Sequence, residues 1–252
     1  MSGTKYLKLF ETHAEYQTYI SGQDAILPNV SYCEDNNDVH YNPFVDPFNG
    51  HDYVDLGLPS GTLWATKNVG ANNITDSGLY FSWGGTTGYT AAQVGTDKNF
   101  TWADYELGDG GSSESNMTKY NSRDGLTTLE AVDDAATVNM GGEWHMPSKE
   151  QIQELLNTSY CTNNWVIDYQ SSGVNGILFT SVADSSKTLF IPAAGLCDGG
   201  SLNNKGYYSS LWSQSINENN VVSSYYLEGS VSVRRLDYYA RYEGYSVRGV
   251  IG

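Results

Sequence analysis

The chain has 252 residues and a formal net charge of −16, and only 17% of its residues are charged. This length accommodates one large domain or two small ones with an ample core. The negative charge argues against nucleic acid and an anionic membrane surface as partners, because both attract Lys and Arg. The 27 glycines, with abundant Asn, Ser, Thr and Tyr, are typical of a β-rich extracellular or virion-type protein rather than a helical cytosolic enzyme.

No stretch approaches about 18 uninterrupted apolar residues, so we expect no membrane insertion. The start of the sequence, MSGTKYLKLF, lacks the apolar run of a signal peptide, which predicts synthesis in a cytoplasm. Cys33, Cys161 and Cys197 are far apart and form neither a disulfide framework nor a CxxC metal site, which leaves open a single Cys161–Cys197 bridge. The acidic segment 33–50 lacks the ligand spacing of a calcium loop, so we expect no metal or other cofactor.

Residues 1–48 have the pattern of a small separate module. Residues 5–10 suit a strand, Thr12 and Glu15 form a capping box for a helix over residues 13–20, and residues 29–32 suit a second strand. The turn-rich residues that follow indicate a linker or docking arm.

The larger domain, residues 49–252, begins with short strand patterns punctuated by Pro and Gly, at 54–56, 63–68 and 79–83. Residues 86–125 are rich in Gly, Ser, Thr, Asn and Asp, and they predict a long surface insertion.

Two helices are predicted next. The first covers residues 128–139, with Thr127 and Glu130 as its capping box. Its expected buried face consists of Leu129, Val132, Ala136 and Val138. The second helix starts after Ser148, its N-cap, with Gln151 at the third helical position. Its expected apolar stripe consists of Ile152, Leu155 and Leu156.

Strand patterns fill the rest of the chain, at 177–181, 188–192, 210–215, 223–228, 230–235 and 245–250. Two helices followed by a run of antiparallel strands predict an α+β fold.

The last part of the chain, from Gly206, differs chemically from the rest. It holds 8 of the 20 tyrosines, and its four Arg balance four carboxylates, so the net negative charge lies upstream. Tyrosine mixed with Ser, Asn and Arg has the chemistry of an antibody-like binding surface, because Tyr gives a large contact face with few rotors to freeze. Tyr also suits antiparallel strands, so composition alone leaves both interpretations open.

Six segments of the larger domain carry motifs of a known kind. In chain order they are YVDLGLPSGTLWATKNVGA, YFSWGG, LEAVDDAATVNMGGEWHMPSKEQIQELL, LFIPAAG, LWSQS and RYEGYSVRGV. In this order they resemble the C-type-lectin-fold domains of Bacteroidetes and their phages. That group includes the Fibrobacter succinogenes major paralogous domain and the variable proteins of diversity-generating retroelements, and it shares its fold with the formylglycine-generating enzyme. The resemblance covers about residues 50–252, and residues 1 to about 45 resemble, more weakly, a module of phage structural proteins. Ser148 and Gly249 depart from the usual Thr and Pro of their motifs.

The resemblance implies a C-type lectin fold with two helices and antiparallel strands. It implies packing and hydrogen-bonding roles for the framework residues Trp64, Trp83, Trp144, Met146, Pro147, Trp212, Gly244, Val247 and Arg248. It places a variable region at about 207–245, where stretches 216–221 and 234–239 would lie between framework strands. The implied ligand-binding residues are Asn217, Glu218, Asn219, Asn220, Tyr226, Glu228, Arg234, Arg235, Leu236, Asp237, Tyr238 and Tyr239.

The leading functional hypothesis is therefore a non-catalytic, tail-associated phage receptor-binding protein. Its expected partner is a bacterial surface protein or glycan, and residues 1–48 would dock to virion or tail components or drive oligomerisation. The expected location is the virion, with the bacterial cell surface as the alternative. A fixed-specificity Bacteroidetes adhesin is the second hypothesis. An enzyme of the formylglycine-generating type is the third, disfavoured because the cysteine pair near the end of the chain and any Ser/His/Asp set are missing.

Overall fold

The computed structural model describes residues 8–10, 30–32 and 47–252. The chain divides into two compact units, Met1–Gly50 and His51–Gly252. In the first unit, β1 (Lys8–Phe10) pairs in parallel with β2 (Val30–Tyr32), at the ends of the two predicted strands. The helix predicted over residues 13–20 lies outside the described residues.

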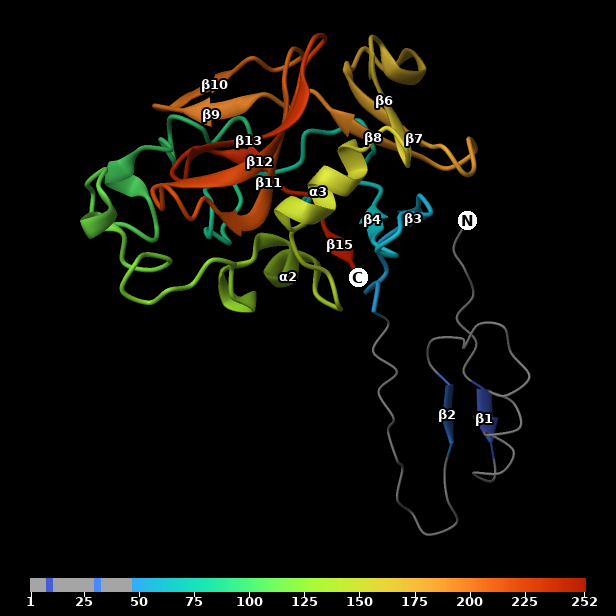
Figure 1. Ribbon diagram of the computed structural model, residues 1–252, viewed down its shortest axis with the longest axis horizontal. Helices are drawn as coiled ribbons and strands as arrows, with labels where there is room; N and C mark the ends of the chain where they lie inside the picture. The colour runs from blue at the N-terminus through green and yellow to red at the C-terminus, as the bar shows by residue number, and fades with distance from the viewer. Residues whose placement is uncertain (1–7, 11–29, 33–46) are drawn as a thin grey trace. The chain divides into compact units, whose positions relative to one another are not determined.

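The second unit is a mixed α+β structure, with few helices and many antiparallel strands in several sheets (Figure 1). Its largest sheet has the order β13-β12-β11-β14-β5, and every pairing is antiparallel except that of β11 with β14. The bounds of these strands are β5 Tyr80–Phe81, β11 Ser209–Ile216, β12 Ser223–Gly229, β13 Arg234–Ala240 and β14 Tyr245–Ser246.

Two three-stranded sheets and one hairpin complete the β structure. The sheet β15-β4-β3 joins the two ends of this unit, because its last strand, β15, pairs with β4 near its start. The remaining strands are β3 Tyr53–Asp55, β4 Leu63–Ala65, β6 Cys161–Val166, β7 Gly176–Ser181, β8 Thr188–Pro192, β9 Leu196–Asp198, β10 Ser201–Asn203 and β15 Val250–Ile251. The short 3₁₀ turns are η1 Trp102–Asp104, η2 Glu114–Asn116, η3 Ala131–Asp133 and η4 Tyr169–Ser171.

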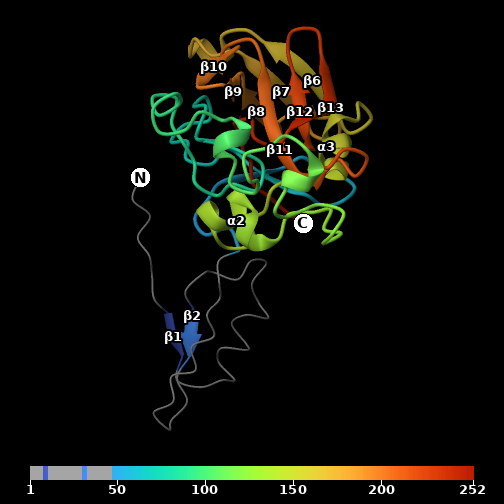
Figure 2. The same cartoon turned by 90° about the vertical axis from the view of Figure 1, so that its left-hand side faces the viewer.

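Helix α3 (Lys149–Leu156) confirms the second predicted helix. Ser148 Oγ accepts a hydrogen bond from the Gln151 amide, and Gln151 Oε1 accepts one from the Ser148 amide, which forms the expected capping box. Ile152 and Leu155 are fully buried in the main core. Helix α3 lies beside β11, β12 and β13 (Figures 1 and 2). It therefore anchors one face of the five-stranded sheet.

The first predicted helix is wrong over its first half. Helix α2 spans only Ala135–Met140, and its N-cap is the buried Asp134, which accepts from the Thr137 and Met146 amides at 2.9 and 2.8 Å. The backbone of Thr127 and Leu129 instead pairs with the end of β11. Of the expected buried face, Val132, which precedes α2, is 70% exposed, and Val138, which lies within α2, is 52% exposed.

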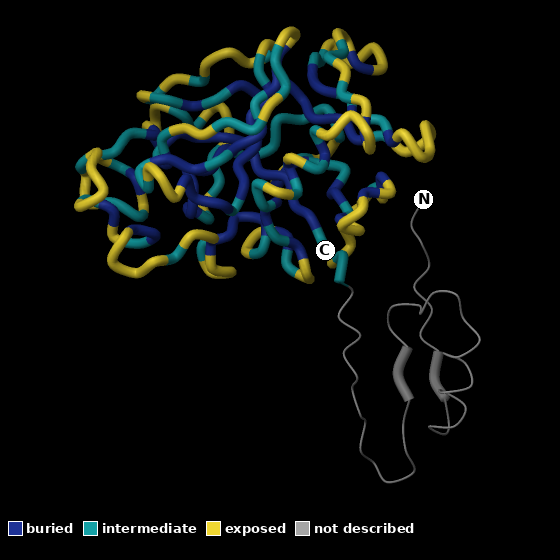
Figure 3. Tube along the Cα trace, viewed as in Figure 1, coloured by how far each residue is buried: buried dark blue, intermediate teal, exposed yellow. Residues whose placement is uncertain are grey.

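The main core is formed where α3 meets the sheets, from residues that include Trp64, Ile152, Phe179, Leu211 and Leu227. Figure 3 shows the buried positions concentrated in the strands and the exposed ones in the connections. All the framework residues implied by the resemblance are buried, as residues that pack inside the fold would be. Position 229 packs so closely against this core that it has no room for a side chain: a Cβ on Gly229 would lie 2.0 Å from Ile177 Cδ1.

The segment predicted as a surface insertion, residues 86–125, has little regular structure but is anchored by aromatic side chains. Phe100 and Tyr120 are fully buried, and Tyr105 is 4% exposed. The Tyr105 hydroxyl donates to the Trp83 carbonyl at 2.8 Å. The connections between these anchors are exposed.

Candidate ligand-binding surface

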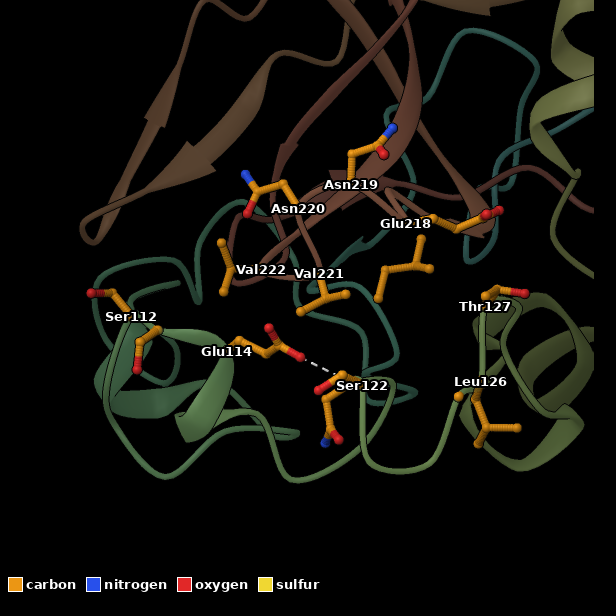
Figure 4. A pocket seen from close by; sticks show the side chains of 14 residues that line it. Ser112, Glu114, Ser122, Leu126, Thr127, Glu218, Asn219, Asn220, Val221 and Val222 are labelled. Atoms are coloured by element: carbon orange, nitrogen blue, oxygen red, sulfur yellow. Dashed lines mark hydrogen bonds between the residues drawn. The ribbon is translucent and has the colours of Figure 1, made fainter.

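A groove with a volume of about 540 Å³ lies between the β11–β12 hairpin and residues 112–127 (Figure 4). The hairpin supplies residues 216 and 218–222. The opposite wall comes from segments 112–114, 121–122 and 125–127. Apolar lining comes from Leu126, Ile216, Val221 and Val222, and polar lining from Ser112, Ser113, Glu114, Asn121, Ser122, Thr127, Glu218, Asn219 and Asn220. This mixture suits a ligand that presents both apolar and hydrogen-bonding groups.

Asn217 shapes the hairpin wall but is not available to a ligand. It is 3% exposed, its Oδ1 accepts from the Asn219 amide at 3.1 Å, and its Nδ2 donates to Ser223 Oγ at 3.3 Å. Its prediction as a contact residue is therefore wrong. The side chain closes the turn and leaves Glu218, Asn219 and Asn220 exposed in the groove.

The opposite wall is held by local hydrogen bonds. Glu114 Oε1 accepts from the Ser122 amide at 3.0 Å, which joins the two segments of this wall (Figure 4). Hydrogen bonds from Ser122 lower the pKa of Glu114, so its carboxylate is ionised at neutral pH. On the hairpin side, Glu218 contacts Lys149 at 3.3 Å.

Arg241 ties the two walls together. Its guanidinium is fully buried and donates to Tyr105 Oη at 2.8 Å, to the Tyr120 and Val221 carbonyls at 3.1 Å each, and to the Lys119 carbonyl at 3.0 Å. These acceptors belong to the 86–125 segment and to the hairpin, so one side chain fixes the spacing of the groove. Arg241 begins the RYEGYSVRGV segment, but it was not among the residues expected to act in the site.

The stretch 234–239, predicted to lie between strands, is instead most of the edge strand β13. The predicted strand 230–235 is wrong because residues 230–233 form the hairpin turn, with the Ser230 amide bonded to the Val233 carbonyl at 2.7 Å. Side chains of β13 therefore alternate between two faces. Leu236 packs against the main core on the α3 face, so Arg235, Asp237 and Tyr239 point to the other face.

Each face of β13 carries a distinct set of contacts. On the α3 face, the ring of Tyr238 meets that of Tyr225 edge to face at 6.1 Å, and Lys149 lies over Tyr225 at 5.3 Å. On the other face, Arg235 bridges Glu228 at 2.6 Å and Asp237 at 2.5 Å. The predicted site residues thus do not form one patch.

The side chain of Tyr226 is on this second face of the sheet, and it is mostly buried. It is 6% exposed, with its ring 4.7 Å from that of Tyr245 and 6.0 Å from that of Trp212. Its prediction as an exposed contact residue is wrong, because the pleat of β12 turns its ring onto the buried aromatics. Sequence alone does not separate it from Tyr225, its half-buried neighbour.

The structure sorts the twelve predicted contact residues by exposure. Six are exposed: Glu218, Asn219, Asn220, Arg235, Tyr238 and Tyr239. Four are partly buried: Glu228, Arg234, Leu236 and Asp237. Two are buried: Asn217 and Tyr226. Glu218, Asn219 and Asn220 come together in the groove, while the β13 residues lie outside its lining.

Cys161 and Cys197 are free and buried, which answers the question of their pairing. Burial raises the pKa of Cys161 to about 11 and that of Cys197 to about 12, so neither supplies a thiolate at neutral pH. Within the described ranges, no group of three or more His, Cys, Asp or Glu residues is arranged to hold a metal ion. No helix in the described part of the chain is long and apolar enough to cross a bilayer.

Comparison of the chain with protein-family models, curated proteins and solved structures finds no match.

Proposed function

We propose that this chain is a non-catalytic ligand-binding protein: a C-type-lectin-fold variable protein of a diversity-generating retroelement, serving as a tail-associated receptor-binding protein of a phage. Its partner would be a bacterial surface protein or glycan. The sequence motifs carry the family assignment, and the geometry of the region around residues 216–241 supports the binding role.

The observation that carries the binding role is the separation of exposed and buried positions within this region. Glu218, Asn219 and Asn220 are exposed on a turn that the buried Asn217 closes. Tyr238 and Tyr239 are 50% and 53% exposed on a strand whose Leu236 is packed in the core. Exposed side chains on a well-packed backbone can change without loss of the fold, and they bind with little ordering cost.

The groove adds a recessed surface of suitable size. Its volume of about 540 Å³ falls in the range of small-ligand sites, so it can accept one loop of a protein or a short stretch of glycan. Half-exposed tyrosines commonly provide a large share of binding energy at such surfaces.

The test is capture of bacterial cells by the immobilised full chain, across a panel of Bacteroidetes strains. We expect specific capture of a subset of strains, with loss of capture by Tyr238→Ala, Tyr239→Ala or Asn219→Ala at an unchanged melting temperature. Tyr160→Ala is the matched control, because Tyr160 is also exposed but lies outside the groove and β13. Equal capture by all the variants, or capture of no strain, would contradict the proposal.

A further inference from the structure

The groove between the β11–β12 hairpin and residues 112–127 has aliphatic side chains on both walls. Leu126 lies on one wall, and Val221 and Val222 lie on the other, all three half-buried (Figure 4). The buried Ile216 adds apolar surface where β11 ends. None of the 14 lining residues is aromatic. Branched aliphatic side chains therefore provide the apolar surface of the groove.

The two walls are joined by hydrogen bonds that exist before any ligand binds. The backbone amide of Ile216 donates to the Thr127 carbonyl at 3.0 Å, which joins the hairpin to the wall that carries Leu126. Arg241 donates to the carbonyl of Val221 on the hairpin and to that of Tyr120 in the 86–125 segment. A site whose walls are already fixed has little ordering cost on binding. The groove is therefore preformed, as ligand sites usually are.

Amide and hydroxyl groups surround the aliphatic side chains. Thr127, Asn219 and Asn220 are exposed along the groove (Figure 4). A carboxamide has the donor and the acceptor of a peptide group, so it can pair with a backbone N–H and a backbone C=O at the same time. These side chains therefore suit the peptide groups on either side of a residue that enters the groove.

The charge of the groove disfavours acidic ligands. Its two charged lining residues, Glu114 and Glu218, are both acidic. Lys149 pairs with Glu218 at 3.3 Å but does not belong to the lining. A ligand that carries carboxylates or other anionic groups would be repelled, whereas a neutral or basic ligand would be accepted.

A row of contacts leads from the groove to an exposed tyrosine on the α3 face of the sheet. Glu218 contacts Lys149, whose Nζ lies 5.3 Å from the centre of the Tyr225 ring. The Tyr225 ring in turn meets that of Tyr238, which is 50% exposed, at 6.1 Å. A ligand that leaves the groove past Glu218 therefore meets Lys149 and two aromatic rings. A polypeptide that continues on both sides of an anchoring residue can use this surface.

The lining of the groove favours a peptide over a sugar. A pyranose ring presents a flat face of C–H groups, which packs best on an aromatic face because that face is negative. No lining residue supplies such a face. A branched aliphatic side chain instead contacts Leu126 on one wall and Val221 on the other, and it gains free energy from the apolar area removed from water.

We infer that the groove binds a branched aliphatic side chain of a protein partner, carried by an extended segment that is neutral or basic. Asn219 and Asn220 pair with the peptide groups beside that side chain, and Lys149, Tyr225 and Tyr238 contact the residues that follow it. Lys149 and Tyr225 are thus further contact residues that the sequence did not predict. This inference rests on the proposed binding function and chooses a protein over a glycan as the partner.

The test is an NMR titration of the full chain, labelled at the methyl groups of Ile, Leu and Val, with end-blocked peptides. We expect Gly-Leu-Gly to shift the methyl signals of Leu126, Val221 and Val222. It should bind at least about fivefold more tightly than Gly-Ala-Gly, because its side chain buries more apolar surface. Lys-Leu-Lys should bind at least about threefold more tightly than Glu-Leu-Glu, because Glu114 and Glu218 repel the acidic peptide. Methyl N-acetylglucosaminide, the glycan probe, should shift none of these signals.

Two variants change the two walls separately. Leu126→Ala and Val221→Thr should each weaken the binding of Gly-Leu-Gly at least about threefold. Val182→Thr is the matched control, because Val182 is also solvent-exposed but lies outside the lining. The methyl spectrum shows whether each variant folds. If Val221→Thr does not, Leu126→Ala decides, since Leu126 lies outside the helices and strands.

Three results would overturn the inference. They are equal binding of the Leu and Ala peptides, no shift of the groove methyl signals with Gly-Leu-Gly, and unchanged affinity in both wall variants. Shifts of these signals by methyl N-acetylglucosaminide but not by Gly-Leu-Gly would make the ligand a glycan and would also overturn it. Capture of cells without binding of the peptides would refute this inference alone. Binding of Gly-Leu-Gly without capture of any strain would contradict the proposed function alone.

Discussion

Replacing Arg241 by Met tests whether this side chain holds the walls of the groove together. The variant would leave the carbonyl groups of Lys119, Tyr120 and Val221 and the Tyr105 hydroxyl without their buried donor. Each buried acceptor left unpaired costs about 1–3 kcal/mol, so a total loss of about 4 kcal/mol or more is expected. For a chain of this size, that loss corresponds to a fall in the melting temperature of roughly 8–16 °C.

Urea unfolding followed by tryptophan fluorescence measures this loss, because all six tryptophans lie in the His51–Gly252 unit. Arg235→Met is the matched control. Arg235 is in the same stretch of sequence, but its side chain is 58% exposed, so solvent screens its ion pairs with Glu228 and Asp237 and its loss should cost much less. The reasoning would be refuted if Arg241→Met lost less than about 1 kcal/mol, or if the two variants unfolded at the same urea concentration.

Three further predictions concern the same region. Tyr226→Ala should lose about 3–5 kcal/mol of unfolding free energy because it empties a buried ring site, whereas Tyr239→Ala should stay within about 0.5 kcal/mol of the parent; similar urea midpoints would contradict this. Burial, with Asp198 as a neighbour, raises the pKa of Glu243 to about 7 from its ordinary 4.5, so the folded state holds a proton that the unfolded state has lost. Stability should therefore fall as pH rises from about 4.5 to 7, by at most about 3 kcal/mol, and Glu243→Gln should remove that slope in urea unfolding at pH 5 and pH 8; an unchanged slope would assign it to other groups. Iodoacetamide at pH 8 should modify Cys161 and Cys197 far more slowly in the folded than in the unfolded chain, as mass spectrometry of the labelled peptides would show, and equal rates would mean that the thiols are accessible.

Elements with strong local signals were predicted well from the sequence. The capping box of Ser148 and Gln151 locates the start of α3, because both partners lie within one helical turn. The predicted strand 188–192 has the bounds of β8, Thr188–Pro192, with an apolar run that ends at a proline.

Elements determined by distant partners were not predicted. Residues 127–129 have helical periodicity, but their backbone groups pair with β11 from a distant part of the sequence. Strand β6 (Cys161–Val166) was missed because the middle of CTNNWV is polar, and its strand form depends on pairing with β7. The alternation in residues 230–233 suggested a strand where the structure has a turn.

The candidate site was only partly predictable, for a related reason. Asn and Tyr occur both on binding surfaces and in structural roles, so the sequence did not separate Asn217 and Tyr226 from their exposed neighbours. Arg241 was missed because three of its four acceptors are backbone carbonyls, which leave no trace in the pattern of side chains. The side of the sheet on which each residue lies follows from the register of β12 and β13, and that register needs the structure.

Deep sequencing of this locus in a natural population tests the central claim most directly. The account predicts substitutions confined to the codons of exposed residues such as Asn219, Asn220, Tyr238 and Tyr239, with Asn217 and Tyr226 constant, beside a near-identical template repeat and a reverse transcriptase gene. A uniform set of codons with no template repeat would contradict it and would favour a fixed-specificity adhesin. Substitutions spread equally over buried and exposed positions would contradict the assignment of the contact surface.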